Sequence, residues 1–545
     1  MALCFSFNKY KMRKFNSLLF IGIYFLFFLF SCNKADNKKE ASIAEEANII
    51  TYNNPVLPGD FADPSVVRVG NDYWATATSS EWAPLFPILH STNLVDWEIV
   101  GHVFPEEAPE WTEAHYWAPE IAYENGTFYI YYTAKKEGGN LCVGVASATN
   151  PKGPYKDHGA LVCQEAGSID GFPIRDENGE LHLIWKEDGN SVGKPTPMWG
   201  QKMNEARTEL LGEKFELFRN DPETWEGGLV EGAYILRKNG YFYTFYAGDA
   251  CCGRGCTYGV GVARSKKLEG PWEKYEQNPI MKQNETWKCA GHGSVVTDTT
   301  GNYYYLYHAY STDGFVYTGR QGLLDKITWG EDNWPHFEDN APSAQSHAPH
   351  QENAPDNLNL TFEFDKSELA ETWQWPVEKS AAFKINPEND GQLIIQAGEG
   401  QLGNLVAQRT LSADYQVTAA INLSTLGEGV QAGLTAIGDQ DNAVGVSVVD
   451  REVVLWSIKA GERIIHKTLE APEEDVIQLR LITRDGDKME FSWSTDKDEW
   501  QALNADEPID ASYLPPWDRA VRVGLNVKGS EGKTAAFDWF KMATE

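Results

Sequence analysis

The 545-residue sequence predicts an all-β protein in which a five-bladed β-propeller is followed by a β-sandwich. Three observations predict this fold. One hairpin pattern recurs five times in the first part of the chain, a polar segment with several prolines follows it, and the last third is a series of short alternating runs. A single core stops growing beyond about 250–300 residues, so a chain of this length is expected to form more than one domain.

The N-terminus has the layout of an export signal. Basic residues between Lys9 and Lys14 precede the apolar run SLLFIGIYFLFFLFSC, which is short for a membrane span. Leu29 to Cys32 resembles a bacterial lipoprotein cleavage box, so we expect residues 1–32 to be a signal peptide, Cys32 to carry a lipid, and residues 33–50 to be a flexible tether. An uncleaved anchor helix is the alternative. Both interpretations predict an exported protein, in the periplasm or at the cell surface.

The five repeated segments each contain a short apolar run, a tight turn and an alternating, mostly aromatic run. Alternation at period two around Asn-Gly or Gly-Asn turns is a strong hairpin signal. The spacing of roughly 55 to 60 residues suits one four-stranded blade per copy, so residues 51–337 are predicted to form a propeller. The copies begin at Asp63, Ala118, Asp170, Glu231 and His292.

Acidic residues open three of these copies. The first strand of every propeller blade lines the central axis, so Asp63, Asp170, Glu231 and His292 are expected to meet at one mouth. Taken singly, Asp before Pro or Gly also starts ordinary turns. Three converging carboxyl groups suit hydrolysis of a glycosidic bond, which needs one protonated and one ionised carboxyl group. The third would raise the pKa of the acid by its negative charge.

The overall composition favours a neutral substrate. A formal net charge of −32 argues against nucleic acid or anionic lipid as a partner, because both would be repelled. The chain contains 19 Trp and 24 Tyr, whose faces can stack on sugar rings, although most are expected to lie in the core.

Six cysteines follow the predicted lipid site. Export permits disulfides, but the sequence leaves their pairing open. The run CCGRGC is also compatible with a thiolate metal site, which is the less common use of exported thiols. The six are Cys142, Cys163, Cys251, Cys252, Cys256 and Cys289.

Several long stretches follow one another in a characteristic order between about Asn54 and Phe337. They include NPVLPGDFADPSVV, YWAPEIAYENGTFYIYYT, SIDGFPIRDENGELHLIW, GGLVEGAYILRKNGYFYTFYA, GHGSVVTD and GRQGLLDKITWGEDNWP. With these stretches the segment resembles glycoside hydrolase family 43, five-bladed propeller enzymes that act on arabinose- and xylose-containing polymers with inversion. The resemblance implies that Asp63 is the general base, Asp170 orients the acid and modulates its pKa, and Glu231 is the general acid.

Four further positions carry over from the family pattern. His292 matches a histidine that in many members holds a calcium ion or its water shell, so substrate contact and a structural calcium ion are expected there; a plain core histidine is the alternative. Arg320 is expected to contact substrate hydroxyls, with a surface ion pair as the alternative. Trp74 and Trp117 are expected to form the sugar platform, or to pack between blades. The chemistry itself requires no cofactor.

Residues 338–356 are polar and contain prolines, so they are predicted to be a linker. Residues 357–545 contain many short alternating runs, such as VVLWSI and MEFSWS, which predict a β-sandwich. This part resembles the concanavalin-like module attached to many family 43 exo-enzymes. In some relatives that module places an aromatic side chain at the pocket rim; a separate sugar-binding role is the alternative.

These observations predict an inverting exo-glycosidase that removes terminal pentose units, with α-L-arabinofuranosidase or β-xylosidase activity. An endo-arabinanase is one alternative, although the long insertions at residues 106–116 and 195–226 favour a closed pocket over an open groove. A lectin-like propeller that binds pentose glycans without cutting them is the other. The complete set of Asp63, Asp170 and Glu231 favours an enzyme.

Overall fold

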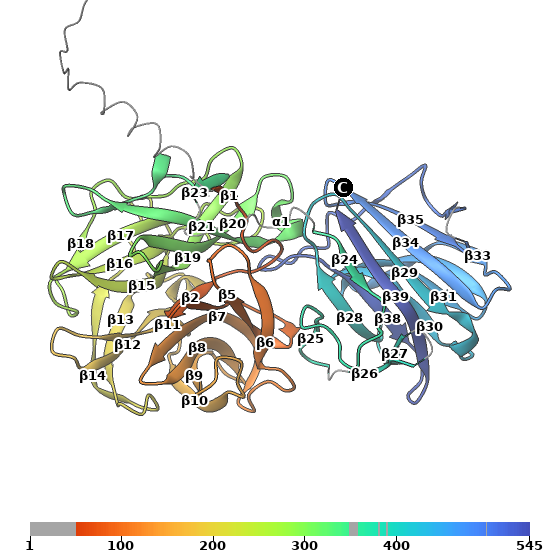
Figure 1. The fold of residues 1–545 in the computed structure, drawn as a ribbon, viewed down its shortest axis with the longest axis horizontal. Coiled ribbons are helices and arrows are strands. Elements are labelled where there is room, and N and C mark those ends of the chain that lie inside the picture. The colour runs from red at the N-terminus through yellow and green to blue at the C-terminus, as the bar shows by residue number, and fades with distance from the viewer. Residues whose placement is uncertain (1–50, 348–357, 380–381, 389–390, 497–498, 545) are drawn as a thin grey trace, which may run out of the picture. The chain divides into compact units, whose positions relative to one another are not determined.

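The computed structural model describes residues 51–347, 358–379, 382–388, 391–496 and 499–544 (Figure 1). The expected signal peptide 1–32, its lipid site and the tether 33–50 lie outside these residues. Within the described ranges, no helix is long and apolar enough to cross a membrane.

Each of the five predicted hairpins supplies the first two strands of a four-stranded antiparallel sheet, or blade (Figure 1). The first two blades are β2 (Ser65–Val69), β3 (Asp72–Thr76), β5 (Leu85–Ser91) and β6 (Glu98–Phe104), then β7 (Thr112–Glu124), β8 (Thr127–Lys136), β9 (Leu141–Ala148) and β10 (Lys156–Cys163). The third blade is β11 (Ser168–Arg175), β12 (Leu181–Glu187), β13 (Met198–Met203) and β14 (Leu210–Phe218). The last two are β15 (Val230–Lys238), β16 (Tyr241–Gly248), β17 (Gly259–Ser265) and β18 (Glu273–Lys274), then β19 (Trp287–Thr297), β20 (Tyr303–Ser311), β21 (Arg320–Trp329) and β22 (Pro335–His336).

The blades close into a ring. Their first strands contact one another in the cyclic order β2, β7, β11, β15, β19 and back to β2. A separate apolar cluster fills each gap between neighbouring blades; between the fifth and first blades it includes Tyr73, Leu89, Leu306 and Leu324. Burial of this apolar surface is the main force that holds one blade against the next. The predicted five-bladed propeller is confirmed.

The C-terminal domain is a sandwich of two antiparallel sheets, as predicted. One sheet contains β24 (Leu360–Phe362), β26 (Phe383–Asn386), β27 (Gln392–Gln396), β29 (Tyr415–Asn422), β34 (Val476–Arg484), β35 (Lys488–Ser494), β36 (Gln501–Ala502), β37 (Ile509–Asp510) and β39 (Thr534–Thr544). The other contains β28 (Asn404–Arg409), β30 (Gln431–Asp439), β31 (Asn442–Val449), β32 (Glu452–Lys459), β33 (Glu462–Glu470) and β38 (Arg522–Lys528). Inward-facing side chains alternate with outward-facing ones, as in β34, so each sheet buries one face in the shared core.

Two short strand pairs and four short helices complete the described structure. One pair, β1 with β23, involves residues within the segment expected to be a linker, so this segment is not wholly unstructured. The other pair, β4 with β25, joins the first blade to the C-terminal domain. The pairs are β1 (Thr51–Asn53) with β23 (Gln345–His347) and β4 (Trp82–Ala83) with β25 (Trp375–Pro376). The helices are η1 (Gly189–Val192), α1 (Phe315–Thr318), η2 (Glu338–Asn340) and η3 (Leu423–Thr425).

A buried aspartate links the propeller to the sandwich. Asp60 is 6% exposed. Its carboxylate accepts hydrogen bonds from the backbone N–H groups of Arg320 (3.2 Å) and Ala520 (3.1 Å) and pairs with the Arg522 guanidinium at 3.2 Å. These partners come from both domains, so the position of the C-terminal domain beside the propeller depends on this carboxylate.

Replacing this aspartate, Asp60→Ala, is expected to destabilise the protein by about 3–5 kcal/mol, because it leaves Arg522 buried without its partner. Thermal unfolding followed by circular dichroism measures the effect. Glu216→Ala is the control: Glu216 pairs with the half-exposed Arg219, and such surface pairs contribute only about 0.2–1 kcal/mol. Equal melting temperatures for the two variants would contradict the role assigned to Asp60.

Candidate active site

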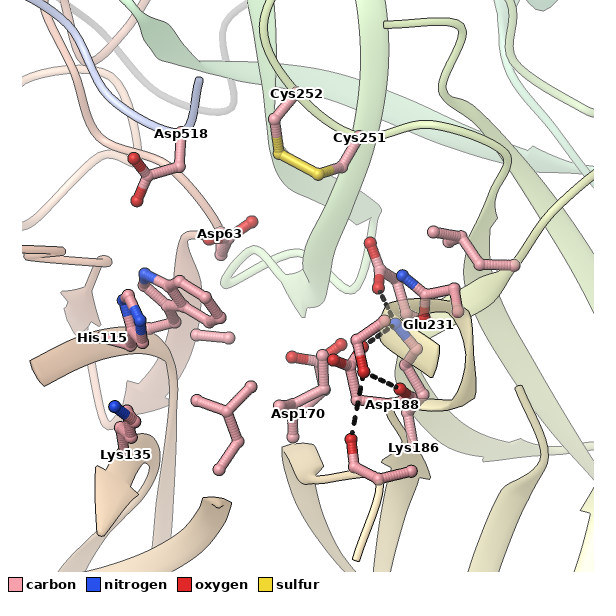
Figure 2. Close-up of a pocket in the computed structure, with 18 of the residues that line it drawn as sticks. Asp63, His115, Lys135, Asp170, Lys186, Asp188, Glu231, Cys251, Cys252 and Asp518 are labelled. Atoms are coloured by element: carbon pink, nitrogen blue, oxygen red, sulfur yellow. Dashed lines mark hydrogen bonds and ion pairs between the residues drawn. A yellow bond between two sulfur atoms is a disulfide. The ribbon is translucent and has the colours of Figure 1, made fainter. Parts of the chain in front are cut away.

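A pocket of ≈ 570 Å³ lies where the first strands of the blades meet. The three acidic residues predicted to converge, Asp63, Asp170 and Glu231, all line it, and they are only 7%, 9% and 7% exposed. Figure 2 shows them within one cavity although they come from three different blades. His292, Arg320 and Trp117 also line it, and their contact with substrate stays a prediction.

The local backbone turns these side chains towards the pocket. Asp63 (φ 51°), Asp170 (φ 58°) and His292 (φ 38°) adopt the left-handed conformation, and in the fourth blade Gly232 (φ 64°) takes this role directly after Glu231. The pairing register shifts at this point in β11, β15 and β19, which marks a β-bulge. Bulges re-aim side chains next to active sites. Gly232 cannot be replaced without movement, because an added Cβ would lie 2.7 Å from the His292 ring.

Asp63 is held as a carboxylate. Arg320 Nη1 lies 3.1 Å from its Oδ1, and the Thr78 hydroxyl donates to its Oδ2 at 2.7 Å. His292 Nδ1 lies 3.4 Å from Oδ1, and the Asp63 backbone N–H donates to His308 Nδ1 at 3.0 Å. Burial acts to raise the pKa of Asp63, but the opposing effects, of which the charge of Arg320 is the largest, outweigh burial and hold the pKa well below its ordinary range.

Glu231 has a cation of its own. Lys186 Nζ donates to its Oε2 at 2.6 Å and to Asp188 Oδ1 at 3.0 Å (Figure 2). The Tyr258 hydroxyl donates to Glu231 Oε1 at 2.8 Å. Lys186 is only 2% exposed. Burial acts to raise the pKa of Glu231, but Lys186, followed by Tyr258, outweighs burial and lowers it.

Of the three carboxyl groups Asp63, Asp170 and Glu231, that of Asp170 takes up a proton most readily. Its Oδ2 accepts a hydrogen bond from the Gly232 N–H at 3.0 Å, and its own N–H donates to Thr133 Oγ1 at 3.1 Å. Burial, with the negative charge of Glu231, raises the pKa of Asp170 to about 6. Lys186 lowers the pKa of Glu231 in the free protein, so below about pH 6 Asp170 binds a proton before Glu231 does. The expected role of Asp170 in modulating the pKa of Glu231 stays a prediction.

Trp74 is placed differently from the expected sugar platform. It does not belong to the residues that line the pocket. Its ring contacts the His90 ring in a tilted arrangement at 4.5 Å between centroids, and it packs edge-to-face with Phe128 of the second blade at 6.3 Å. Trp74 lies on β3, the second strand of its blade, where one face packs against the neighbouring blade, so it contributes to the core between blades.

Neither of the two places considered for a metal ion offers a full set of side-chain ligands. All six cysteines form disulfides, Cys142–Cys163, Cys251–Cys252 and Cys256–Cys289, so CCGRGC offers no free thiolate. No group of three or more His, Cys, Asp and Glu side chains in the described ranges is arranged to hold a metal ion. Calcium takes 6–8 oxygen ligands, and near His292 the carboxylate of Asp63 is already bound by Arg320 and Thr78. This donor set does not fit a calcium ion held by side chains alone.

Several residues that line the pocket were not predicted from the sequence. Lys186 carried the same signal as Glu231, a charge at the end of an apolar strand in the stretch LHLIWK, and that signal was sufficient to find it. Trp517 and Asp518 come from the C-terminal domain and have no motif of their own. The Trp517 ring meets Trp117 edge-on at 6.0 Å between centroids, so the C-terminal domain does place an aromatic side chain at the pocket rim.

The raised pKa of Asp170 gives a pH-dependent contribution to stability. A carboxyl group with a folded pKa above its unfolded value stabilises the fold when protonated, and this contribution is lost as the pH rises through about 6. We therefore expect Asp170→Asn to be less sensitive than the natural protein to a rise from about pH 4 to pH 7, by roughly 2–3 kcal/mol. Urea unfolding at both pH values measures this. An identical pH dependence in the two proteins would show that Asp170 titrates normally.

Comparison with known proteins supports the reading of this pocket. The family model for glycosyl hydrolases family 43 matches residues 52–335, and the model for the beta xylosidase C-terminal concanavalin A-like domain matches residues 361–543. A protein named xylosidase/arabinosidase from Butyrivibrio fibrisolvens is 30% identical over 53% of this chain, and the chain spans only 56% of that relative. Xylosidase/arabinosidase 43B from Humicola insolens is 24% identical over 85% of this chain and 90% of its own length.

Solved structures show the same arrangement of domains. The crystal structure of the GH43 BlXynB protein from Bacillus licheniformis superposes with a TM-score of 0.77 at 25% identity, and the match covers 91% of this chain and 100% of that one. The fold, the matched residues and the converging carboxyl groups agree. The chain belongs to glycosyl hydrolases family 43.

Proposed function

We propose that the protein is an inverting exo-glycosidase that releases terminal α-L-arabinofuranose or β-D-xylose units from arabinose- or xylose-containing glycans. The observation that carries this proposal is the convergence of Asp63, Asp170 and Glu231 in one pocket, where Arg320 pairs with Asp63 at 3.1 Å and Lys186 pairs with Glu231 at 2.6 Å. The names of the Butyrivibrio and Humicola relatives cover both sugars, which supports the substrate class and leaves the choice between them open.

The proposed reaction needs only side chains of this protein. Asp63 accepts a proton from a water molecule as the water oxygen attacks the anomeric carbon. The bond between that carbon and the leaving oxygen breaks, and Glu231 gives its proton to the leaving oxygen. In this proposal the proton that Asp170 binds in the free protein moves to Glu231 before the bond breaks, so that Glu231 can give it to the leaving oxygen. Asp170 also accepts a hydrogen bond from the N–H of Gly232, the residue after Glu231, and so helps to orient Glu231. No cofactor takes part.

The contribution of the C-terminal domain to the pocket supports exo cleavage over an endo-arabinanase activity. Trp517 and Asp518 from this domain line the pocket together with the propeller residues. An endo-acting enzyme needs a groove open at both ends, whereas a closed pocket admits only a chain end. A binding-only propeller would have no need for two carboxyl groups in opposite protonation states.

The variant Glu231→Gln tests the proposed acid. We expect its rate on arabino- or xylo-oligosaccharides to fall by about 10²–10⁴-fold, because an amide is too weak an acid to protonate the leaving sugar oxygen. The fall should be smaller on 4-nitrophenyl glycosides, whose leaving group needs little protonation. Initial rates on both substrate types measure this split.

Glu226→Gln is the matched control. Glu226 is also buried, and it is held by a lysine and a tyrosine, Lys274 at 2.7 Å and Tyr246 at 2.7 Å, but it does not line the pocket. It should share the loss of stability without the loss of rate. Equal effects of the two substitutions on the rate would show that Glu231 acts only through folding.

We also propose export and attachment to a membrane through a lipid on Cys32. The three disulfides support an oxidising compartment. The test is metabolic labelling with a palmitate analogue in a bacterial host. The natural protein should be labelled and Cys32→Ala should not. Equal labelling, or none in either protein, would contradict the lipid site.

A further inference from the structure

The disulfide between the neighbouring residues Cys251 and Cys252 lines the pocket. Figure 2 shows it at the top of the view, with Asp63 below it towards His115 and Glu231 below it on the other side. Both cysteines are partly exposed, whereas the carboxyl groups are buried. The disulfide therefore lies nearer to the pocket mouth than the catalytic carboxyl groups do.

The loop that carries this disulfide is fixed from several sides. The Ala250 carbonyl accepts hydrogen bonds from the N–H groups of Thr257 (2.9 Å) and Tyr258 (3.1 Å). The Gly253 N–H donates to the Tyr310 hydroxyl at 3.1 Å, and Cys256 is joined to β19 by a second disulfide. A surface held in this way needs little ordering when a ligand binds, which favours affinity.

The same loop contacts the C-terminal domain and the proposed acid. Arg254 donates to the Ser512 carbonyl at 2.8 Å, and a Cβ added at Gly253 would lie 3.0 Å from the Trp517 carbonyl. At its other end, Tyr258 donates to Glu231 at 2.8 Å. Trp517, at the pocket rim, is 60% exposed. A sugar in contact with this loop would therefore lie between Trp517 and Glu231.

A disulfide offers carbon and sulfur surface with only weak hydrogen-bonding capacity. The pocket floor, formed by Asp63, Asp170, Lys186 and Glu231, is instead polar and charged. A sugar ring has polar edges and apolar C–H faces, so the two kinds of surface suit different parts of a substrate. The released sugar must lie on the floor beside Asp63 and Glu231, which places the next sugar of the chain at the mouth.

We propose that the Cys251–Cys252 disulfide contacts the sugar on the leaving-group side and thereby helps to determine which linkages the pocket accepts. The inference rests on the proposed function and deepens it, because it assigns a substrate contact to residues that take no part in proton transfer. Loss of one apolar contact of this kind changes specificity by about 10–200-fold.

The test uses the full chain with both cysteines replaced, Cys251→Ser and Cys252→Ser. With xylobiose and α-1,5-arabinobiose as probes, kcat/KM on the accepted disaccharide should fall at least about tenfold, mainly through a higher KM. Inhibition by the free monosaccharide, which occupies the floor alone, should be unchanged. The double variant Cys142→Ser and Cys163→Ser also loses one disulfide, but outside the pocket lining, and it should keep the kcat/KM of the natural protein.

A second measurement does not depend on how the cysteine variant folds. In Glu231→Gln, a saturating disaccharide should slow reduction of Cys251–Cys252 by a water-soluble phosphine and leave reduction of Cys142–Cys163 unchanged, as read by alkylation and mass spectrometry. Equal reduction rates with and without disaccharide would overturn the inference, as would an unchanged kcat/KM in a folded cysteine variant. If the natural protein releases no pentose from either disaccharide, the proposed function fails and the inference fails with it.

Discussion

The guanidinium of Arg320 joins three distant parts of the chain at one point. Arg320 begins β21 in the fifth blade and is 4% exposed. Its Nη1 contacts both carboxylate oxygens of Asp63, just before the first blade, at 3.1 and 3.3 Å, and its Nη2 donates to the Asp518 carbonyl of the C-terminal domain at 2.9 Å. Closure of the propeller, the ionised state of Asp63 and the C-terminal wall of the pocket all depend on this buried group.

Charge balance within the pocket explains how neighbouring acidic residues take different roles. A buried carboxylate without a partner costs several kcal/mol. Arg320 compensates Asp63 and Lys186 compensates Glu231, but Asp170 has no cation within hydrogen-bonding distance among the described residues. Asp170 is therefore the group whose pKa rises to about 6. The positions of two cations thus decide which carboxyl group is a base and which pair carries the proton.

The sequence predicts the blades and the convergence of the three acidic residues, because hairpin periodicity specifies both the strands and the phase at which each residue enters the axis. It does not predict that Lys186 pairs with Glu231. That contact depends on which side chains of two adjacent blades face each other, and alternation within one strand contains no such information. For the same reason it left open whether Trp74 faces a sugar or the next blade. Trp517 reaches the pocket through packing between domains, which a local pattern does not encode.

The central claim is that Asp63 remains an ionised base that activates water and does not attack the sugar itself. Proton NMR during the first minutes of hydrolysis of a β-xyloside or α-L-arabinofuranoside tests this most directly, because it shows the anomer of the released sugar before it equilibrates. The account predicts that the first product has the inverted configuration. A product that first appears with retained configuration would mean that a carboxylate forms a bond to the sugar, and this would contradict the account.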